Sequence, residues 1–219
     1  GQPGAVIGKE RRPLVEGERY HVFPDGLRKA KRVIDLASRF KLPLVTLIDT
    51  QGADPGLEAE EQGIGNAIAT TLSSMLTVPT PMVSVVIGEG GSEGALALGL
   101  SDRILIQQYA VYSPMSANHT LGAAYHDHML DRETAEALML TAHDCVELGI
   151  ADQVVAEPEG GAHVDPREAS KIDNFRQGAV TIDPWPPQGR FLIDFDNFLA
   201  TILPPFFNFV RGVRKPQKR

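Results

Sequence analysis

The sequence predicts an α/β protein in which helices surround a mainly parallel β-sheet. Segments with apolar residues at every third or fourth position alternate with short runs of consecutive apolar residues. These are the patterns of amphipathic helices and of buried strands. Glycine and proline residues follow the runs, as they do in turns at strand ends. An alternating order of strands and helices favours parallel strands joined by helical crossovers.

The expected elements follow from these patterns in chain order. Apolar residues between Leu27 and Phe40 recur at helical spacing before Pro43, which predicts a helix over 25–41. The run LVTLI over 44–48 predicts a strand that is buried on both faces. The other expected elements are helices over 57–77, 92–100, 131–142 and 143–148, strands or extended segments over 5–7, 82–87, 103–106, 110–112 and 153–156, and a glycine loop over 88–91.

The composition is that of a soluble globular domain. The chain has 219 residues, of which 42% are hydrophobic, and a net charge of −7. Folding buries roughly 70–75% of the surface of an unfolded chain of this length, so the core needs no disulfide. The acidic balance argues against nucleic acid as a partner. The longest apolar stretch, 199–210, is too short and too rich in proline to span a bilayer, and we expect a cytoplasmic protein.

The two ends of the chain differ from its middle. The chain begins at Gly1 without Met and strand-like residues follow closely, so we expect a piece of a longer polypeptide, truncated at its N-terminus. Beyond residue 179, proline and aromatic residues gather, and the last nine residues include five basic and no acidic ones. We therefore predict one domain over 1–179 and an aromatic and basic C-terminal segment over 180–219. This segment is expected to be a docked terminal helix, with a partner-binding or membrane-surface helix as the alternative.

A glycine-rich turn over 88–95, GEGGSEGA, is the strongest candidate for a site. Glycines let the backbone approach a ligand closely, and amides at a helix start attract negative charge. Such amides can stabilise an oxyanion without any acid or base side chain. A second loop over 49–56, DTQGADPG, also follows a predicted strand. Because ligands bind at the carboxyl ends of parallel strands, we expect the two loops to face one site. A turn that needs glycine only for packing is the alternative.

The segment Gly90 to Gly94 also fits G-x-S-x-G, the turn that exposes the nucleophile of α/β-hydrolases. A serine hydrolase that uses Ser92 is therefore a competing hypothesis. Candidate bases and orienting acids downstream are His119, His126, His128, His143 and His163, and Asp102, Asp127, Asp131, Asp144 and Asp152. The histidines lack the spacing of metal ligands and no phosphate-binding loop motif occurs, so we expect no bound metal and no nucleotide hydrolysis.

Several segments occur in one order along the chain. They are VIG over 6–8, PDGLRKAKRVIDLASRFKLPL over 24–44, LIDTQGADPG over 47–56, EAEEQG over 58–63, VIGEGGSEGALALG over 86–99, AVYS over 110–113 and GGAHVD over 160–165. Together they resemble the carboxyltransferase alpha subunit of multisubunit acetyl-CoA carboxylase, a branch of the crotonase-like superfamily. The resemblance covers about residues 5–168. It implies a crotonase-like fold of ββα repeats around a mainly parallel sheet.

The resemblance also implies an activity. It is the transfer of a carboxyl group from carboxybiotin on a carrier protein to acetyl-CoA or another acyl-CoA, giving malonyl-CoA for fatty acid or related synthesis. The implied partners in a hetero-oligomer are a beta-type carboxyltransferase subunit and a biotin carboxyl carrier protein, in the cytoplasm or in the plastid stroma of a plant. The implied site has the backbone amides of Gly94 and Ala95 as an oxyanion hole, a loop shaped by Gly90 and Gly91, and an opposite wall formed by Gly52 and Gly56.

Two acidic residues depart from the family's pattern. The family usually shows GGSGGA where this chain has Glu93, and DTPGAYPG where it has Gln51 and Asp54. A carboxylate beside a developing anion is unfavourable unless it points away. Glu93 and Asp54 therefore suggest a non-catalytic assembly subunit as a second alternative.

Overall fold

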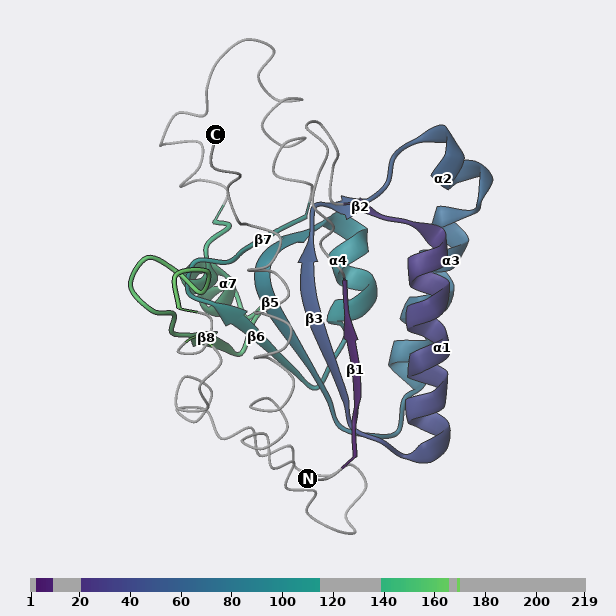
Figure 1. The fold of residues 1–219 in the computed structure, drawn as a ribbon, viewed down its shortest axis with the longest axis horizontal. Coiled ribbons are helices and arrows are strands. Elements are labelled where there is room, and N and C mark those ends of the chain that lie inside the picture. The colour runs from purple at the N-terminus through teal and green to yellow at the C-terminus, as the bar shows by residue number, and fades with distance from the viewer. Residues whose placement is uncertain (1–2, 10–20, 115–138, 166–168, 170–219) are drawn as a thin grey trace, which may run out of the picture.

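The computed structural model describes residues 3–9, 21–114, 139–165 and 169. A six-stranded parallel sheet forms the centre of this part (Figure 1). The strands β1 (Ala5–Gly8), β3 (Leu44–Thr50), β5 (Met82–Gly91), β6 (Arg103–Gln107) and β8 (Gln153–Val155) lie side by side in that order. Strand β7 (Val111–Ser113) pairs with the carboxyl end of β5, and β2 (His21–Val22) pairs with β4 (Gly52–Ala53) in a small second sheet. All these pairings are parallel, which confirms the predicted fold class.

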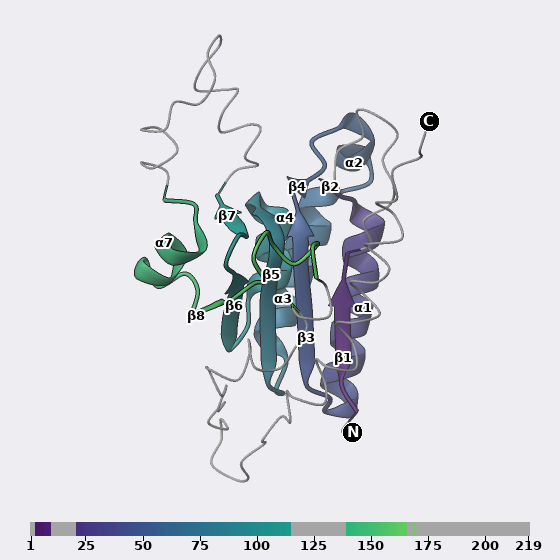
Figure 2. The same cartoon turned by 60° about the vertical axis from the view of Figure 1, so that its left-hand side comes forward.

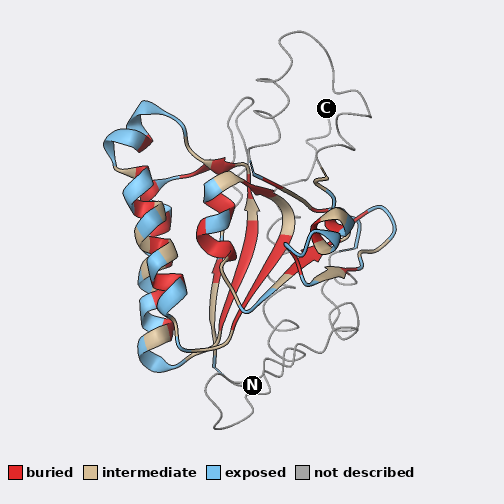
Figure 3. Cartoon of the chain, turned by 180° about the vertical axis from the view of Figure 1, so that it is seen from behind, coloured by how far each residue is buried: buried red, intermediate tan, exposed pale blue. Residues whose placement is uncertain are grey.

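The three longest described helices pack in layers against one side of the sheet (Figures 1 and 2). Helix α4 (Ser92–Gly99) contacts β3 and β5, and α3 (Ile64–Thr77) contacts both α4 and α1 (Pro24–Phe40). Figure 3 shows that α1 and α3 bury the side that faces the sheet and expose the outer side, as amphipathic helices do. Two short helices, α2 (Leu57–Glu61) and α7 (Ala142–Glu147), complete the described set.

The central strand β3 is buried on both faces, as its continuous apolar run predicts. Leu44 and Ile48 belong to the cluster that includes α1 and α4 residues, whereas Val45 and Leu47 belong to a cluster on the opposite face. Side chains alternate between the faces of a strand. Both faces of β3 therefore need apolar side chains.

A polar contact inside the core joins α4 to two strands. The hydroxyl oxygens of Thr46 on β3 and Ser84 on β5 lie 2.8 Å apart. Each also lies within hydrogen-bonding distance of the carbonyl oxygen of Leu98, at 2.7 and 2.9 Å. Buried hydroxyl groups need such partners. The contact therefore specifies how α4 sits on the sheet.

The predicted single helix over 57–77 is wrong, because the chain forms α2 and α3 with a break between them. Gly63 adopts a left-handed backbone with φ of +76° at the start of α3. Glycine reaches this region without the steric cost that other residues meet. The break gives α3 its own start beside the carboxyl ends of the strands.

The predicted glycine loop over 88–91 is also wrong, because these residues continue strand β5. Gly90 is paired with Thr50 of β3, and Glu89 to Gly91 are paired with β7. The β3 register shifts between Ile48 and Thr50, which marks a bulge. The second predicted loop contains the short strand β4, which the sequence analysis missed.

The remaining predicted elements agree with the structure to within about two residues, as expected for element ends. The helix over 25–41 corresponds to α1, and the helices over 92–100 and 143–148 correspond to α4 and α7. Most of the helix expected over 131–142 lies outside the described residues, and 139–141 are not helical. The C-terminal segment over 180–219 also lies outside them. None of the described helices combines the length and apolar character needed to cross a bilayer.

A backbone contact at Gly94 leads to a prediction about stability. A Cβ atom at Gly94 would lie 2.5 Å from the carbonyl carbon of Gly52 and 2.6 Å from the nitrogen of Ala53. We expect Gly94→Ala to lower the free energy of unfolding by about 2–3 kcal/mol, because backbone atoms cannot yield as a side chain can. Urea denaturation measures this change.

Gly65 of α3 provides the matched control. A Cβ atom there would meet nothing within 4 Å. We expect Gly65→Ala to raise the free energy of unfolding by about 0.4–1 kcal/mol, because alanine restricts the unfolded chain. Equal effects of the two substitutions would contradict the contact at Gly94.

Candidate functional site

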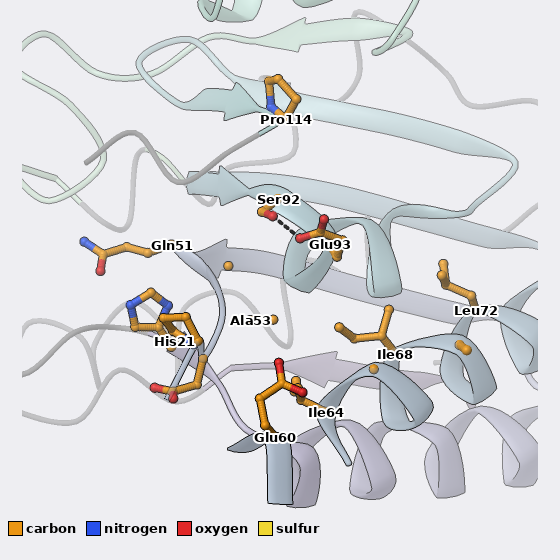
Figure 4. A pocket seen from close by; sticks show the side chains of 15 residues that line it. His21, Gln51, Ala53, Glu60, Ile64, Ile68, Leu72, Ser92, Glu93 and Pro114 are labelled. Carbon is orange, nitrogen blue, oxygen red and sulfur yellow. Dashed lines mark hydrogen bonds between the residues drawn. The ribbon is translucent and has the colours of Figure 1, made fainter. Parts of the chain in front are cut away.

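A cavity of about 620 Å³ lies at the carboxyl ends of β3 and β5 (Figure 4). Segments from both predicted loops line it, together with β2, α2 and α3. The lining residues are His21, Gln51, Gly52, Ala53, Asp54, Pro55, Glu60, Ile64, Gly65, Ile68, Ala69, Leu72, Ser92, Glu93 and Pro114. This is the edge of a parallel sheet at which α/β proteins bind their ligands.

Only one of the six predicted site residues, Gly52, lines the cavity directly. Gly52 has a φ of +132°, and its extra Cβ atom would lie 3.2 Å from Cβ of Ser92. Gly56 precedes α2, and its N–H donates to Oδ1 of Asp54 at 2.8 Å. Gly56 therefore shapes the turn beside the cavity.

Gly90 and Gly91 hold the end of β5 against its neighbours. A Cβ atom on Gly91 would lie 2.3 Å from the carbonyl oxygen of Gln51, and one on Gly90 would lie 2.3 Å from Cδ2 of Tyr112. Both positions need glycine for close packing. That packing brings the segment from Gln51 beside the start of α4.

Gly94 and Ala95, the predicted oxyanion donors, are buried in the first turn of α4. Gly94 is the third helical residue, and its N–H belongs to the first group of amides, which have no acceptor within a regular helix. Ala95 is the fourth, and in a regular helix its N–H is directed to the carbonyl oxygen of Gly91. The role of these amides toward a ligand stays a prediction.

Helix α3 supplies an apolar wall that the sequence analysis did not assign to the site. Ile64, Ile68 and Leu72 lie one helical turn apart and line the cavity opposite Ser92 and Glu93 (Figure 4). An apolar wall with few polar groups is typical of small-molecule pockets. The spacing of these residues predicts one helical face, but the packing of α3 against α4 brings that face to the cavity.

The cavity is acidic. The carboxylates of Asp54, Glu60 and Glu93 belong to its lining, and none of the 15 described residues that line it is Lys or Arg. The Asp54 carboxylate is engaged by the Gly56 N–H. This side chain therefore acts locally as a turn acceptor.

Glu93 lies at the start of α4 with its side chain on the cavity wall. The Ser92 hydroxyl donates a hydrogen bond to the Glu93 carboxylate (Figure 4). This bond and the backbone N–H of Glu93 hold the pKa of the carboxyl below its usual value, although burial acts in the opposite direction. A negative charge is also favourable at a helix N-terminus. Glu93 is therefore charged near neutral pH.

Ser92 has features that bear on the hydrolase hypothesis. Its φ of +54° is left-handed, as expected for a sharp turn between a strand and a helix. Its hydroxyl, however, donates to Glu93 and not to an imidazole. His143 and His163 are exposed and do not line the cavity, whereas His119, His126 and His128 lie outside the described residues.

His21 is a cavity residue that the sequence analysis missed. It is 6% exposed, and its ring lies beside Gln51 on the cavity wall (Figure 4). Its position comes from the pairing of His21 with Gly52 between β2 and β4. Its carbonyl oxygen accepts a hydrogen bond of 2.6 Å from Nζ of Lys9. No local motif around His21 could have indicated this position.

In the described parts of the chain, no group of three or more His, Cys, Asp and Glu side chains is arranged to hold a metal ion.

Cys145 is a free, buried cysteine in α7. Burial raises the pKa of its thiol, and the nearby Asp144 acts in the same direction. A raised thiol pKa opposes reactivity.

The fold and cavity define a parallel α/β protein with a site where two glycine-containing strand ends meet. A family model described as acetyl co-enzyme A carboxylase carboxyltransferase-like matches residues 1–177. The chain belongs to this family, which confirms the resemblance seen in the sequence.

Curated relatives agree with this assignment. The acetyl-coenzyme A carboxylase carboxyl transferase subunit alpha of Deinococcus radiodurans is 53% identical over 142 residues, covering 65% of this chain and 45% of the relative. The subunit of the same name from Rhodospirillum centenum is 46% identical over 167 residues, covering 74% and 53%. The chain thus spans about half the length of the curated relatives it matches.

Solved structures share the fold. A transcarboxylase 12S structure has a TM-score of 0.56 at 23% identity and covers 78% of this chain and 33% of its own. The beta subunit of P. aeruginosa geranyl-CoA carboxylase also has a TM-score of 0.56 at 23% identity, with coverage of 68% and 30%. The Pseudomonas malonate decarboxylase hetero-dimer has a TM-score of 0.59 at 15% identity, with coverage of 70% and 65%. These likenesses confirm the crotonase-like fold.

The charge on Glu93 leads to a prediction about the pH dependence of stability. We expect Glu93→Gln to lower the free energy of unfolding near neutral pH by about 0.3–1 kcal/mol, through loss of the charge at the helix N-terminus. Because the folded-state pKa lies below its usual value, the stabilisation is complete above the unfolded-state pKa. It is lost as the pH falls through the folded-state pKa.

Urea denaturation of wild type and Glu93→Gln at a series of pH values measures this difference. Glu61→Gln removes an exposed carboxylate at the end of α2 and is the control. A gap between Glu93→Gln and wild type that persists unchanged at acidic pH would show that charge is not its cause.

Proposed function

We propose that the chain is the alpha-type half of a biotin-dependent acyl-CoA carboxyltransferase. It moves a carboxyl group between carboxybiotin on a carrier protein and acetyl-CoA or another acyl-CoA, giving malonyl-CoA in the first case. One observation carries the proposal: the two glycine-containing segments of the family pattern meet in one cavity, at the carboxyl ends of β3 and β5. The names of the curated relatives support the same activity.

The cavity fits a biotinyl group in size and in apolar character. Its volume of about 620 Å³ lies within the range of small-molecule pockets, and Ile68 and Leu72 offer an apolar wall to a fused ring. Bound carboxybiotin would supply the carboxyl group. The residues fit a neutral ring better than a negatively charged one, because Asp54, Glu60 and Glu93 surround the space.

The chain's own residues would act mainly through the backbone. The N–H of Gly94 lies at the positive end of the α4 dipole and would donate a hydrogen bond to a ligand oxygen, which stabilises negative charge on that oxygen. Gly90 and Gly91 hold the strand end close enough to Gln51 for the cavity to form. Gly52 lines the cavity beside the first turn of α4, and the turn at Gly56 lies next to it. No side-chain base is required of this half.

We propose a hetero-oligomer with a beta-type subunit and a biotin carboxyl carrier protein. The acyl-CoA would be held with the help of the beta-type subunit. The division into a domain over 1–179 and a segment over 180–219, the absence of a bound metal and the cytoplasmic location stay predictions.

The direct test is carboxyl transfer by the complex of the two subunits. We expect the complex of this chain with its beta-type partner to carboxylate biocytin from malonyl-CoA, with acetyl-CoA as the second product. Neither chain alone should show the reaction, because each provides one half of the site. Quantifying acetyl-CoA by chromatography measures the rate. A stable complex without transfer would indicate the assembly role instead.

The apolar wall allows a matched pair of variants in the same assay. Leu72→Glu places a charge on the cavity wall and should raise KM for biocytin at least about ten-fold, which corresponds to about 1.4 kcal/mol. Leu76 lies one turn further along α3 and is 73% exposed. Leu76→Glu should leave KM unchanged. Equal effects of the two variants would contradict binding at this wall.

The hydrolase alternative makes a separate prediction. The Ser92 hydroxyl donates to a carboxylate, and we expect Ser92→Ala to leave turnover of p-nitrophenyl acetate unchanged. A nucleophilic serine would instead lose most of its rate, by a factor of about 10³ or more. Ester hydrolysis by both proteins under identical conditions measures the difference. A loss of that size would replace the carboxyltransferase proposal.

A further inference from the structure

We infer that Glu93 sets the charge preference of the cavity and opposes the build-up of negative charge at the start of α4. The inference rests on the proposed function, because it concerns the same cavity. It assigns to Glu93 the role of a specificity-determining residue that slows transfer of an anionic group. The charge preference would favour a neutral group, or one that donates hydrogen bonds.

The position of Glu93 supports this role. Glu93 is the second residue of α4 and directly precedes Gly94, whose amide is the proposed donor to a ligand oxygen. Its carboxylate is tied to the Ser92 hydroxyl and lies on the cavity wall. The chain's own negative charge therefore already complements the positive end of the helix dipole before any ligand arrives.

The rest of the lining does not offset this charge. Asp54 and Glu60 add two carboxylates, and no described lining residue is Lys or Arg. The Asp54 carboxylate accepts a hydrogen bond from the Gly56 N–H, so it is held in the turn that precedes α2. The Glu93 side chain is exposed enough for salt to screen its charge. Each of the two carboxylates accepts a hydrogen bond, and Glu93 is the more exposed of the two residues.

The kinetic test compares two neutralising substitutions in the complex with the beta-type subunit. We expect Glu93→Gln to raise kcat for transfer from malonyl-CoA to biocytin by about ten-fold, with a smaller change in KM, since the repelled charge develops during the reaction. Glu61→Gln makes the same change in net charge at a residue that does not line the cavity, and it should leave kcat unchanged. Added salt should raise kcat of wild type more than that of Glu93→Gln.

A binding test needs neither partner nor substrate. Acetate, the simplest carboxylate, is titrated into the full chain at constant ionic strength, with chloride as the balancing anion. The backbone N–H signals of residues 92–95 are followed by NMR. We expect Glu93→Gln to bind acetate at least about ten-fold more tightly than wild type or Glu61→Gln, because the competing carboxylate is gone.

Each outcome decides between the two proposals. An active wild-type complex, with equal kcat and equal acetate affinity in Glu93→Gln, would overturn the inference and leave the proposed function intact. A gain in kcat without a gain in acetate affinity would also overturn it, because charge would not be the cause. An active wild-type complex, with a gain of about ten-fold in both kcat and acetate affinity in Glu93→Gln, would support it. No transfer by either complex would overturn the proposed function, and the acetate titration would still decide the charge preference of the cavity.

Discussion

The structure depends on a close approach of two backbone segments that only glycine permits. The end of β5 and the first turn of α4 lie against residues 51–53, with Gly91 beside Gln51 and Gly94 beside Gly52 and Ala53. A side chain at either glycine would push the segments apart. This contact aligns the helix start with the carboxyl end of β3. The cavity exists because the two strand ends and the helix meet at this point.

The same contact explains why most of the predicted site glycines do not themselves line the cavity. Gly90, Gly91 and Gly94 face backbone or ring atoms of neighbouring elements, so their first role is to permit packing. The surfaces that reach the cavity belong to adjacent residues, including Ser92 and Glu93. In the proposed site, where backbone amides act, the side chains beside these glycines would set the charge and shape. One of those side chains in this chain is Glu93.

The cavity carries carboxylates where a typical anion-binding site would carry none. A helix N-terminus favours negative charge, but here a carboxylate of the chain occupies that environment, with Asp54 and Glu60 nearby. Membership of the carboxyltransferase-like family suggests that the cavity receives an anionic group, whereas an acidic lining disfavours such a group. The family assignment rests on residues along most of the chain, whereas the charge conflict rests on a few side chains. An effect of these carboxylates on the rate or specificity of the proposed carboxyl transfer therefore needs fewer assumptions than a different reaction.

The α/β class, the mainly parallel sheet, most helix and strand positions and the family could be predicted from the amino-acid sequence, whereas the order of the strands in the sheet could not. These features depend on local periodicity, on glycine and proline positions and on motifs in a fixed order. The tertiary structure decided the composition of the site. His21 reaches the cavity through the pairing of β2 with β4, and the packing of α3 against α4 brings Ile68 and Leu72 to its wall. Such contacts join segments that are far apart in the chain, so no local pattern encodes them.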